Sequence, residues 1–141
     1  MHVLPASPER FSQAIALLEK NGLPTKDISP GTQLFVAEEN GEMKGTIAVE
    51  YDFNDALLRS LCVDEHNRSK GTGEALVRFI EDYVQQQGIQ NIYLLTTTAM
   101  SFFSRLGYRV VERHRVASFI QTTSEFTSVC PASATVMVKS L

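Results

Sequence analysis

The sequence of 141 residues lacks the features that would place it outside the ordinary globular class. It has no tryptophan and only two cysteines, Cys62 and Cys130, so no disulfide framework is expected. No apolar run approaches the roughly 20 residues that span a bilayer, and the N-terminus has neither a charged nor an apolar signal region. We therefore expect one cytoplasmic domain over residues 1–141, with free thiols and no membrane contact.

The chain also lacks an excess of positive charge. Its formal net charge is −3, which argues against a general nucleic-acid-binding protein, because such a protein needs a basic face. No spacing of histidine, cysteine and acidic residues indicates a zinc site, so no metal is expected. Hydrophobic residues make up 43% of the chain, enough for a core that needs no disulfide or metal support.

One segment stands out, the basic, glycine-bearing stretch Arg68-Ser69-Lys70-Gly71-Thr72-Gly73. It follows a β-rich run, residues 56–63, and a helical pattern begins directly after it. Unpaired N–H groups of a first helical turn point at an anion bound there, and glycine allows close backbone approach. The segment therefore predicts a phosphate-binding turn.

Three interpretations of this turn have to be weighed. A Rossmann site would need GxGxxG directly after the strand and an acid about 20 residues later, at the end of a second parallel strand, whereas the spacing here is RxxGxG. A Walker A loop would need GxxxxGK[ST], which is absent. The remaining alternative is a plain glycine-rich turn between a strand and a helix.

The order of the expected elements indicates a mixed α/β sheet covered by helices. Asn40-Gly41 between two β-rich runs predicts a hairpin, and Leu76, Phe79, Ile80 and Tyr83 form the apolar stripe of a helix. Expected strands are 3–4, 33–38, 43–51, 56–63, 92–96, 108–111 and 134–138. Expected helices start at Ser7, after Gly73 and at Ala99, and residues 116–129 are ambiguous, with a short helix as one interpretation.

Two motifs about 35 residues apart resemble those of the GNAT N-acetyltransferase superfamily. Arg68-x-x-Gly71-x-Gly73 matches its pyrophosphate loop, and the stretch AxxFFxxLGY at 99–108 is similar to its second motif. The resemblance implies a mostly antiparallel sheet of six to seven strands, with a central, splayed parallel pair and helices on both faces. Residues 22–27, 94–99 and 130–134 further resemble the subgroup described as arsenic-resistance N-acetyltransferases.

The resemblance implies acetyl-CoA as cosubstrate and a small-molecule amine as acceptor. Backbone groups of Leu61 and Val63 would pair with the pantetheine arm, and the Val63 N–H would polarise the thioester carbonyl. The implied cofactor-binding set also includes the phosphate turn and the second motif: Arg68, Ser69, Lys70, Gly71, Thr72, Gly73, Glu74, Phe102 and Phe103. Superfamily members often form dimers, so a homodimer is compatible with the resemblance.

The usual catalytic acid of the superfamily is missing. A tyrosine often protonates the departing thiolate, and its aligned position here is Phe103. An asparagine common a few residues earlier aligns with Thr96, which we take as a candidate hydroxyl. Thr97, Thr98, Ser101 and Tyr108 are further hydroxyls nearby. The alternative for the threonine run is a strand end of high β-propensity, and a water could then protonate the thiolate.

Two charged residues are candidates for the acceptor side. Arg59 interrupts an apolar strand and, by simple alternation, would share a face with Leu61. It could clamp a carboxylate of the acceptor, or form an internal ion pair with Asp27, Glu50 or another acid. Asp27 lies in a loop that usually walls the acceptor site in this superfamily, although a loop carboxylate can also cap a turn.

The remaining candidates are expected to be structural. Glu50 and Asp52 are expected to be solvated charges at a strand end, and Cys62 and Cys130 to be buried thiols rather than arsenic ligands. His66 and His114 are expected to lie on the surface. The sequence thus favours an N-acetyltransferase that acts on a small amine, such as an amino acid or an amino-acid-like toxin, by direct attack in a ternary complex. A non-catalytic acyl-CoA sensor and a protein N-acetyltransferase are the alternatives.

Overall fold

The computed structural model describes residues 1–28, 32–129 and 133–141. Seven strands form one sheet in the order β1-β2-β3-β4-β5-β7-β6, and all neighbours are antiparallel except β4 and β5. The strands are β1 His2–Pro5, β2 Gln33–Glu39, β3 Glu42–Tyr51, β4 Asp55–Val63, β5 Asn91–Thr96, β6 Arg109–Val110 and β7 Thr135–Ser140. The longer helices are α1 Pro8–Lys20, α2 Thr72–Gln86 and α3 Met100–Arg105. The predicted fold class is thereby confirmed.

Local sequence signals explain several boundaries. Ser7 caps α1, because its hydroxyl oxygen accepts a hydrogen bond of 3.2 Å from the Arg10 N–H. Asn40 and Gly41 have φ of 54° and 79°, the left-handed pair that a tight hairpin between β2 and β3 requires. Residues 116–129, ambiguous in sequence, form α4 (Ser118–Gln121) and a π-helical turn, η3 (Glu125–Val129).

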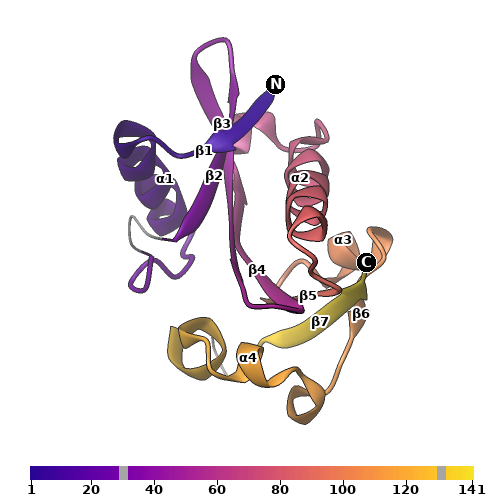
Figure 1. Cartoon of the computed structure of the whole chain (residues 1–141). Helices are drawn as coiled ribbons and strands as arrows, with labels where there is room; N and C mark the ends of the chain where they lie inside the picture. The colour runs from indigo at the N-terminus through magenta and orange to yellow at the C-terminus, as the bar shows by residue number, and fades with distance from the viewer. Residues whose placement is uncertain (29–31, 130–132) are drawn as a thin grey trace.

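Helices cover both faces of the sheet (Figure 1). The predicted stripe of α2 lies on one face, where Leu76 and Ile80 are fully buried against β2, β3 and β4. On the other face, α1 packs through Ala14 against β2 and β3, and α4 packs through Ile120 against Leu57 and the C-terminal strands. Within the described residues, no helix combines the length and apolar character that crossing a bilayer requires.

The parallel strands β4 and β5 separate part-way along their length. They pair only at Asp55–Asn91, Ala56–Ile92 and Leu57–Tyr93, although β4 continues to Val63 and β5 to Thr96. Beyond Leu57, β4 stays with β3 and β5 stays with β7, so the two halves of the sheet diverge (Figure 1). An opening therefore lies at the centre of the sheet, beside the ends of both strands.

A β-bulge in β4 corrects the expected placement of Arg59. The register with β3 shifts between Thr46–Cys62 and Ala48–Arg59, and Ser60 has φ of 57°. This extra residue reverses the alternation of side chains. Leu61 therefore packs on the α2 face, while Arg59 lies on the opposite face with α1 and α4. The prediction that Arg59 and Leu61 share a face is wrong.

Candidate functional site

The phosphate turn leaves several backbone donors at the start of α2. Ser69 and Gly71 have φ of 64° and 82°, which reverses the chain sharply before the helix. The Ala75 N–H donates to the Gly71 carbonyl at 3.0 Å, the first bond of the helix. The N–H groups of the residues between them therefore precede the helical ladder, and the helix dipole adds a partial positive charge there.

A groove of about 690 Å³ extends from this turn along β4. Gly73 keeps the groove open, because a Cβ built there would lie 3.4 Å from Phe102 Cζ across it. The lining residues are Asn21, Leu23, Leu61, Cys62, Val63, Asn67, Arg68, Ser69, Gly71, Gly73, Glu74, Thr98, Ala99, Phe102 and Arg105. Most of the predicted cofactor set is thus gathered in one place. Three members of that set are not among the lining residues: Lys70, which is exposed, Thr72, which is 7% exposed, and Phe103, which is 5% exposed.

Arg68 is held across the rim of this groove. Its Nε donates to the Val63 carbonyl at 3.2 Å and its Nη2 to the Asn21 side-chain oxygen at 2.8 Å. These contacts connect the end of α1 to the phosphate turn. Arg68 lines the groove together with Ser69, Gly71 and Gly73, so its guanidinium adds positive charge to the wall that holds the phosphate turn.

The groove continues into a cavity of about 360 Å³ at the opening between β4 and β5. The two linings share Leu23, Leu61, Thr98 and Ala99. The other residues of the cavity are Gly22, Pro24, Leu58, Arg59, Ser60, Leu94, Leu95, Thr96, Thr97, Phe103, Glu125 and Ala134. The cavity is therefore aliphatic over most of its wall, with hydroxyls at the end of β5 and one pair of charged residues.

The end of β4 presents backbone groups toward the groove. The Asp64 N–H donates to the Lys44 carbonyl on β3 at 2.9 Å. Backbone N–H and C=O groups alternate in direction along an antiparallel strand, so those of Val63 point away from β3. The hydrogen bond from Arg68 to the Val63 carbonyl is consistent with this direction. The predicted donor, the Val63 N–H, thus lies on the side of the groove, and its role toward a thioester stays a prediction.

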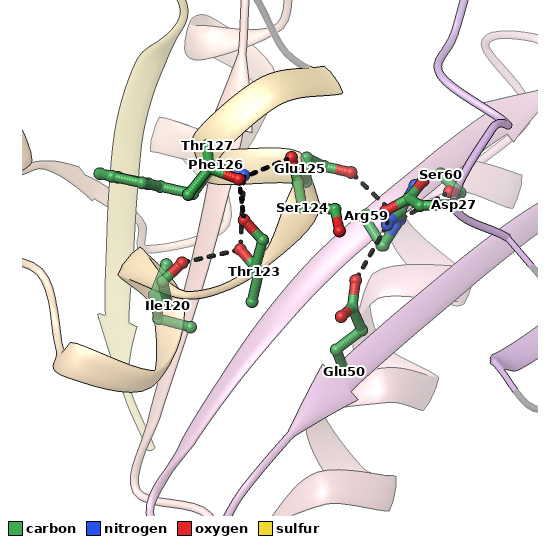
Figure 2. Close-up of polar contacts among 10 residues, drawn as sticks. All are labelled: Asp27, Glu50, Arg59, Ser60, Ile120, Thr123, Ser124, Glu125, Phe126 and Thr127. Carbon is green, nitrogen blue, oxygen red and sulfur yellow. Dashed lines mark hydrogen bonds and ion pairs between the residues drawn. The ribbon is translucent and has the colours of Figure 1, made fainter.

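Arg59 lies at the centre of an ion cluster that forms part of the cavity wall (Figure 2). Its Nε lies 3.1 Å from Glu125 Oε2, its Nη1 donates to Glu50 Oε2 at 2.9 Å and to Asp27, and its Nη2 donates to Asp27 Oδ1 at 2.7 Å. The arginine side chain is only 1% exposed. Of the two interpretations of Arg59, the internal ion pair is therefore the one that matches its contacts.

The cluster shifts the pKa values of its members. The hydrogen bond from Arg59 lowers the pKa of Asp27, against the smaller, opposite effect of burial. Burial alone would lower the pKa of Arg59, but the carboxylates of Asp27, Glu125 and Glu50 raise it above its ordinary value. Asp27 therefore stays ionised at neutral pH, and a lowered pKa makes it a poor proton acceptor.

Glu125 is the residue of the cluster that the sequence interpretation missed. Thr123 positions it, because the Thr123 hydroxyl donates to the Ile120 carbonyl at 2.7 Å and accepts from the Phe126 N–H at 3.3 Å (Figure 2). The α4 end and η3 are thereby tied together, and the glutamate side chain, 5% exposed, is directed at Arg59. Its one sequence signal is that it is the only acid after Glu112.

Glu50 corrects another expectation. It was expected to be a solvated strand-end charge, but it pairs with Arg59 and is one-third exposed. With Asp27 it lines a second cavity of about 520 Å³, together with Thr32, Gln33, Val49, Tyr51 and Phe119. Asp52, in contrast, is exposed, and its carboxylate caps the turn by accepting from the N–H groups of Asn54 and Asp55 at 3.0 and 2.9 Å.

The candidate hydroxyls differ in their surroundings. The Thr96 hydroxyl oxygen accepts from the Ala99 N–H at 2.9 Å and so fixes the start of α3, which leaves its own proton available to the cavity. The Tyr108 hydroxyl turns into the core and donates to Glu81 at 3.0 Å, and burial raises its pKa. Phe103 is 5% exposed and packs edge-on against Phe102 and Tyr108.

The remaining sequence candidates lie apart from the cavity or outside the described residues. Cys62 is buried, which raises the pKa of its thiol, and Cys130 falls in the part that is not described. The His66 and His114 side chains are 85% and 71% exposed. Among residues 1–28, 32–129 and 133–141, no group of three or more histidine, cysteine, aspartate or glutamate side chains is arranged to hold a metal ion.

A sheet that opens between two parallel strands, beside a phosphate-type turn that starts a helix, defines the acetyltransferase class of α/β folds. The model of the acetyltransferase (GNAT) domain matches residues 30–110, and the chain belongs to this GNAT family. An uncharacterized N-acetyltransferase of Chlorobaculum tepidum, CT2212, is 36% identical over 80 residues. That match spans 56% of this chain and about half, 51%, of the relative.

Solved structures share the fold across the chain. N-acetylglutamate synthase from Neisseria gonorrhoeae, complexed with coenzyme A and N-acetyl-glutamate, has a TM-score of 0.85 at 17% identity, over 99% of this chain and 35% of that one. Rv2747 from Mycobacterium tuberculosis, in complex with CoA and a second ligand, has a TM-score of 0.84 at 17% identity, over 100% and 99%. At these identities the likeness shows the fold alone.

Proposed function

We propose that the protein is an acetyl-CoA-dependent N-acetyltransferase that acetylates the amine of a small molecule. The observation that carries this proposal is the continuity of groove and cavity, whose linings share Leu23, Leu61, Thr98 and Ala99. The groove starts at free N–H groups and Arg68, which suit a pyrophosphate. The cavity at its other end lies where the sheet opens, so that an acyl group and an amine would meet there.

The transfer is a direct attack in a ternary complex. The neutral amine nitrogen bonds to the thioester carbonyl carbon, the carbon–sulfur bond breaks, and the proton that the nitrogen then loses is transferred to the departing thiolate. The Val63 N–H would donate to the carbonyl oxygen as negative charge develops on it. Thr96 would supply the thiolate proton directly or through water, because its hydroxyl oxygen is occupied only as an acceptor from Ala99.

A non-catalytic acyl-CoA-binding domain is the second candidate. The observation that favours it is Phe103, which occupies the position of the usual acid and is buried against Tyr108. A thiolate is a tolerable leaving group, however, so the loss of one acid slows transfer without preventing it. The two functions differ in whether an acceptor accelerates the release of CoA thiol.

The experiment that decides between them follows thiol release from acetyl-CoA while amines and peptides are added in turn. The panel pairs amino acids with amines that lack a carboxylate, and it includes amino-acid-like toxins because of the resemblance to the arsenic-resistance subgroup. We expect release to rise with at least one small amine. If no amine or peptide raises it while CoA still raises the melting temperature, the protein binds CoA without catalysing transfer.

A further inference from the structure

The charged residues around the two cavities form a single cluster. Within the described part of the chain, Arg59 and Glu125 are the only charged residues that line the cavity between β4 and β5. Of the residues that the structure describes, Asp27 and Glu50 are the charged ones that line the second cavity. All three carboxylates pair with the same guanidinium (Figure 2). The charged residues that line these two cavities are therefore three carboxylates and one guanidinium.

Arg59 is poorly placed to receive the carboxylate of an acceptor. Each of its three nitrogens already meets a carboxylate of the protein, and its side chain is 1% exposed. A carboxylate from outside would have to displace Glu125, the partner that lines the same cavity. It would also bring a further negative charge next to a cluster that already has two in excess.

The excess negative charge of this cluster is weakly screened by solvent. The side chains of Glu125 and Asp27 are 5% and 16% exposed, so water screens their charge weakly. The rest of the cavity wall is mostly aliphatic, with Leu58, Leu94 and Leu95 among its residues. Such a cavity favours a flexible carbon chain that carries an ammonium group and disfavours one that also carries a carboxylate.

We propose, on the basis of the function proposed above, that the acceptor is an aliphatic amine without a carboxylate, and that Glu125 attracts its ammonium group. The cavity then selects against amino acids, and Arg59 serves as the counter-ion that keeps three carboxylates together. The class of acceptor is a cationic amine, of which aliphatic diamines are the simplest members. Glu125 acts here on binding, before the amine loses its proton and attacks the thioester.

Matched pairs of acceptors test this selection. Cadaverine and lysine, putrescine and ornithine, and agmatine and arginine differ only by one carboxylate. We expect kcat/KM from thiol release to favour the amine of a pair by about tenfold or more, because one carboxylate would face the two excess negative charges. Equal values, or a preference for the amino acid, would overturn the proposal.

Two variants link the selection to Glu125. Glu125→Gln removes one negative charge from the cavity wall, so the amine-to-amino-acid ratio of kcat/KM should fall several-fold, mostly through KM of the amine. Glu112→Gln is the matched control, because it removes the same charge from an exposed side chain of the same segment. An unchanged ratio in Glu125→Gln would overturn the role of this residue.

Separate measurements show whether the Glu125→Gln variant folds and whether the proposed function holds. CoA should raise the melting temperature of Glu125→Gln as it does that of the wild type, and if the variant does not fold, Glu50→Gln replaces it. If no acceptor raises thiol release, the proposed function fails. Calorimetric titration of the CoA-saturated protein with the same pairs then decides the inference, which holds if the amine binds more tightly and is overturned if the amino acid does.

Discussion

The proposed donor and acceptor regions of this protein are built in different ways. The donor region, residues 61–76, is one continuous segment, and its chemistry comes from backbone N–H groups at a turn and a helix start. The acceptor region around Arg59 joins the side chains of Asp27, Glu50 and Glu125, from a loop, a strand and a turn. A backbone site tolerates most side-chain changes, whereas a side-chain cluster depends on each of its members.

Gly73→Asp should break the donor region most completely. A Cβ at this position meets Phe102 at an ordinary distance of 3.4 Å, so the variant should fold, but its carboxylate would face the phosphates of CoA. We expect the melting temperature without CoA to change little, and the rise caused by CoA to disappear. A rise equal to that of the wild type would place the phosphates elsewhere.

Arg59→Ala should disrupt the acceptor region and lower the stability of the fold. Removing one member of a buried ion cluster leaves the other charges uncompensated, so we expect a loss of about 3–5 kcal/mol in the free energy of unfolding. Urea unfolding measures it, with the exposed Arg109→Ala on β6 as the control that should stay within about 0.5 kcal/mol.

A double variant checks the cause of that loss. Asp27→Asn added to Arg59→Ala removes one of the stranded carboxylates, so the double variant should lose less than the sum of the two single variants. Additive losses would mean that Arg59 contributes by packing and not by charge.

The same contrast explains how much the sequence predicts. Signals that lie within a few residues of their effect are read correctly, as with the Ser7 cap, the Asn40-Gly41 hairpin and the stripe on α2. The element order also yields the correct mixed α/β class, and the resemblance to the superfamily adds the central parallel pair. The short turns of 116–129 have no such signal, because their shape depends on packing against β4 and β7.

The candidate site shows the limit more sharply. Ser60 carries no mark of the bulge that turns Arg59 away from Leu61, since a left-handed serine is indistinguishable in sequence from any strand serine. The partners of Arg59 were only partly predicted, because Asp27 and Glu50 were named among several acids. Glu125 was missed, since its contact with Arg59 joins segments that no local pattern relates.

Asp27→Asn should lower the stability of the acceptor region by an amount that depends on pH. At neutral pH we expect a loss of about 1.5–3 kcal/mol, since charge-assisted bonds to Arg59 are weakened. Because the folded pKa of Asp27 lies below its unfolded value near 3.8, this contribution is complete above that pH and disappears as the pH falls through the folded pKa.

Urea unfolding of both proteins between pH 7 and about pH 2 measures this difference. The curves of free energy against pH should converge at the acid end, while Asp82→Asn, an exposed change on α2, should follow the wild type throughout. A difference that stays constant or grows toward low pH would show that the Asp27 carboxylate is not stabilised by Arg59.

Thr46→Val should have the smallest effect on stability but should reach both regions. The Thr46 side chain is fully buried, and its hydroxyl donates to the Ser60 carbonyl at 2.9 Å, where the bulge separates Arg59 from Leu61. Valine keeps the shape but leaves that carbonyl without this donor, so we expect a loss of about 1–2 kcal/mol.

The bulge sets both the direction of Arg59 and the exposure of the backbone at Leu61 and Val63, so loosening it should affect more than stability. We expect kcat/KM to fall for CoA-dependent transfer and the preference for amines over amino acids to narrow in the same variant. Ser140→Ala removes a hydroxyl at the C-terminal end of β7, away from the bulge and from the cavity, and should leave both quantities near the wild-type values. If Thr46→Val lowers stability alone, the two regions are set independently, and the bulge only separates them.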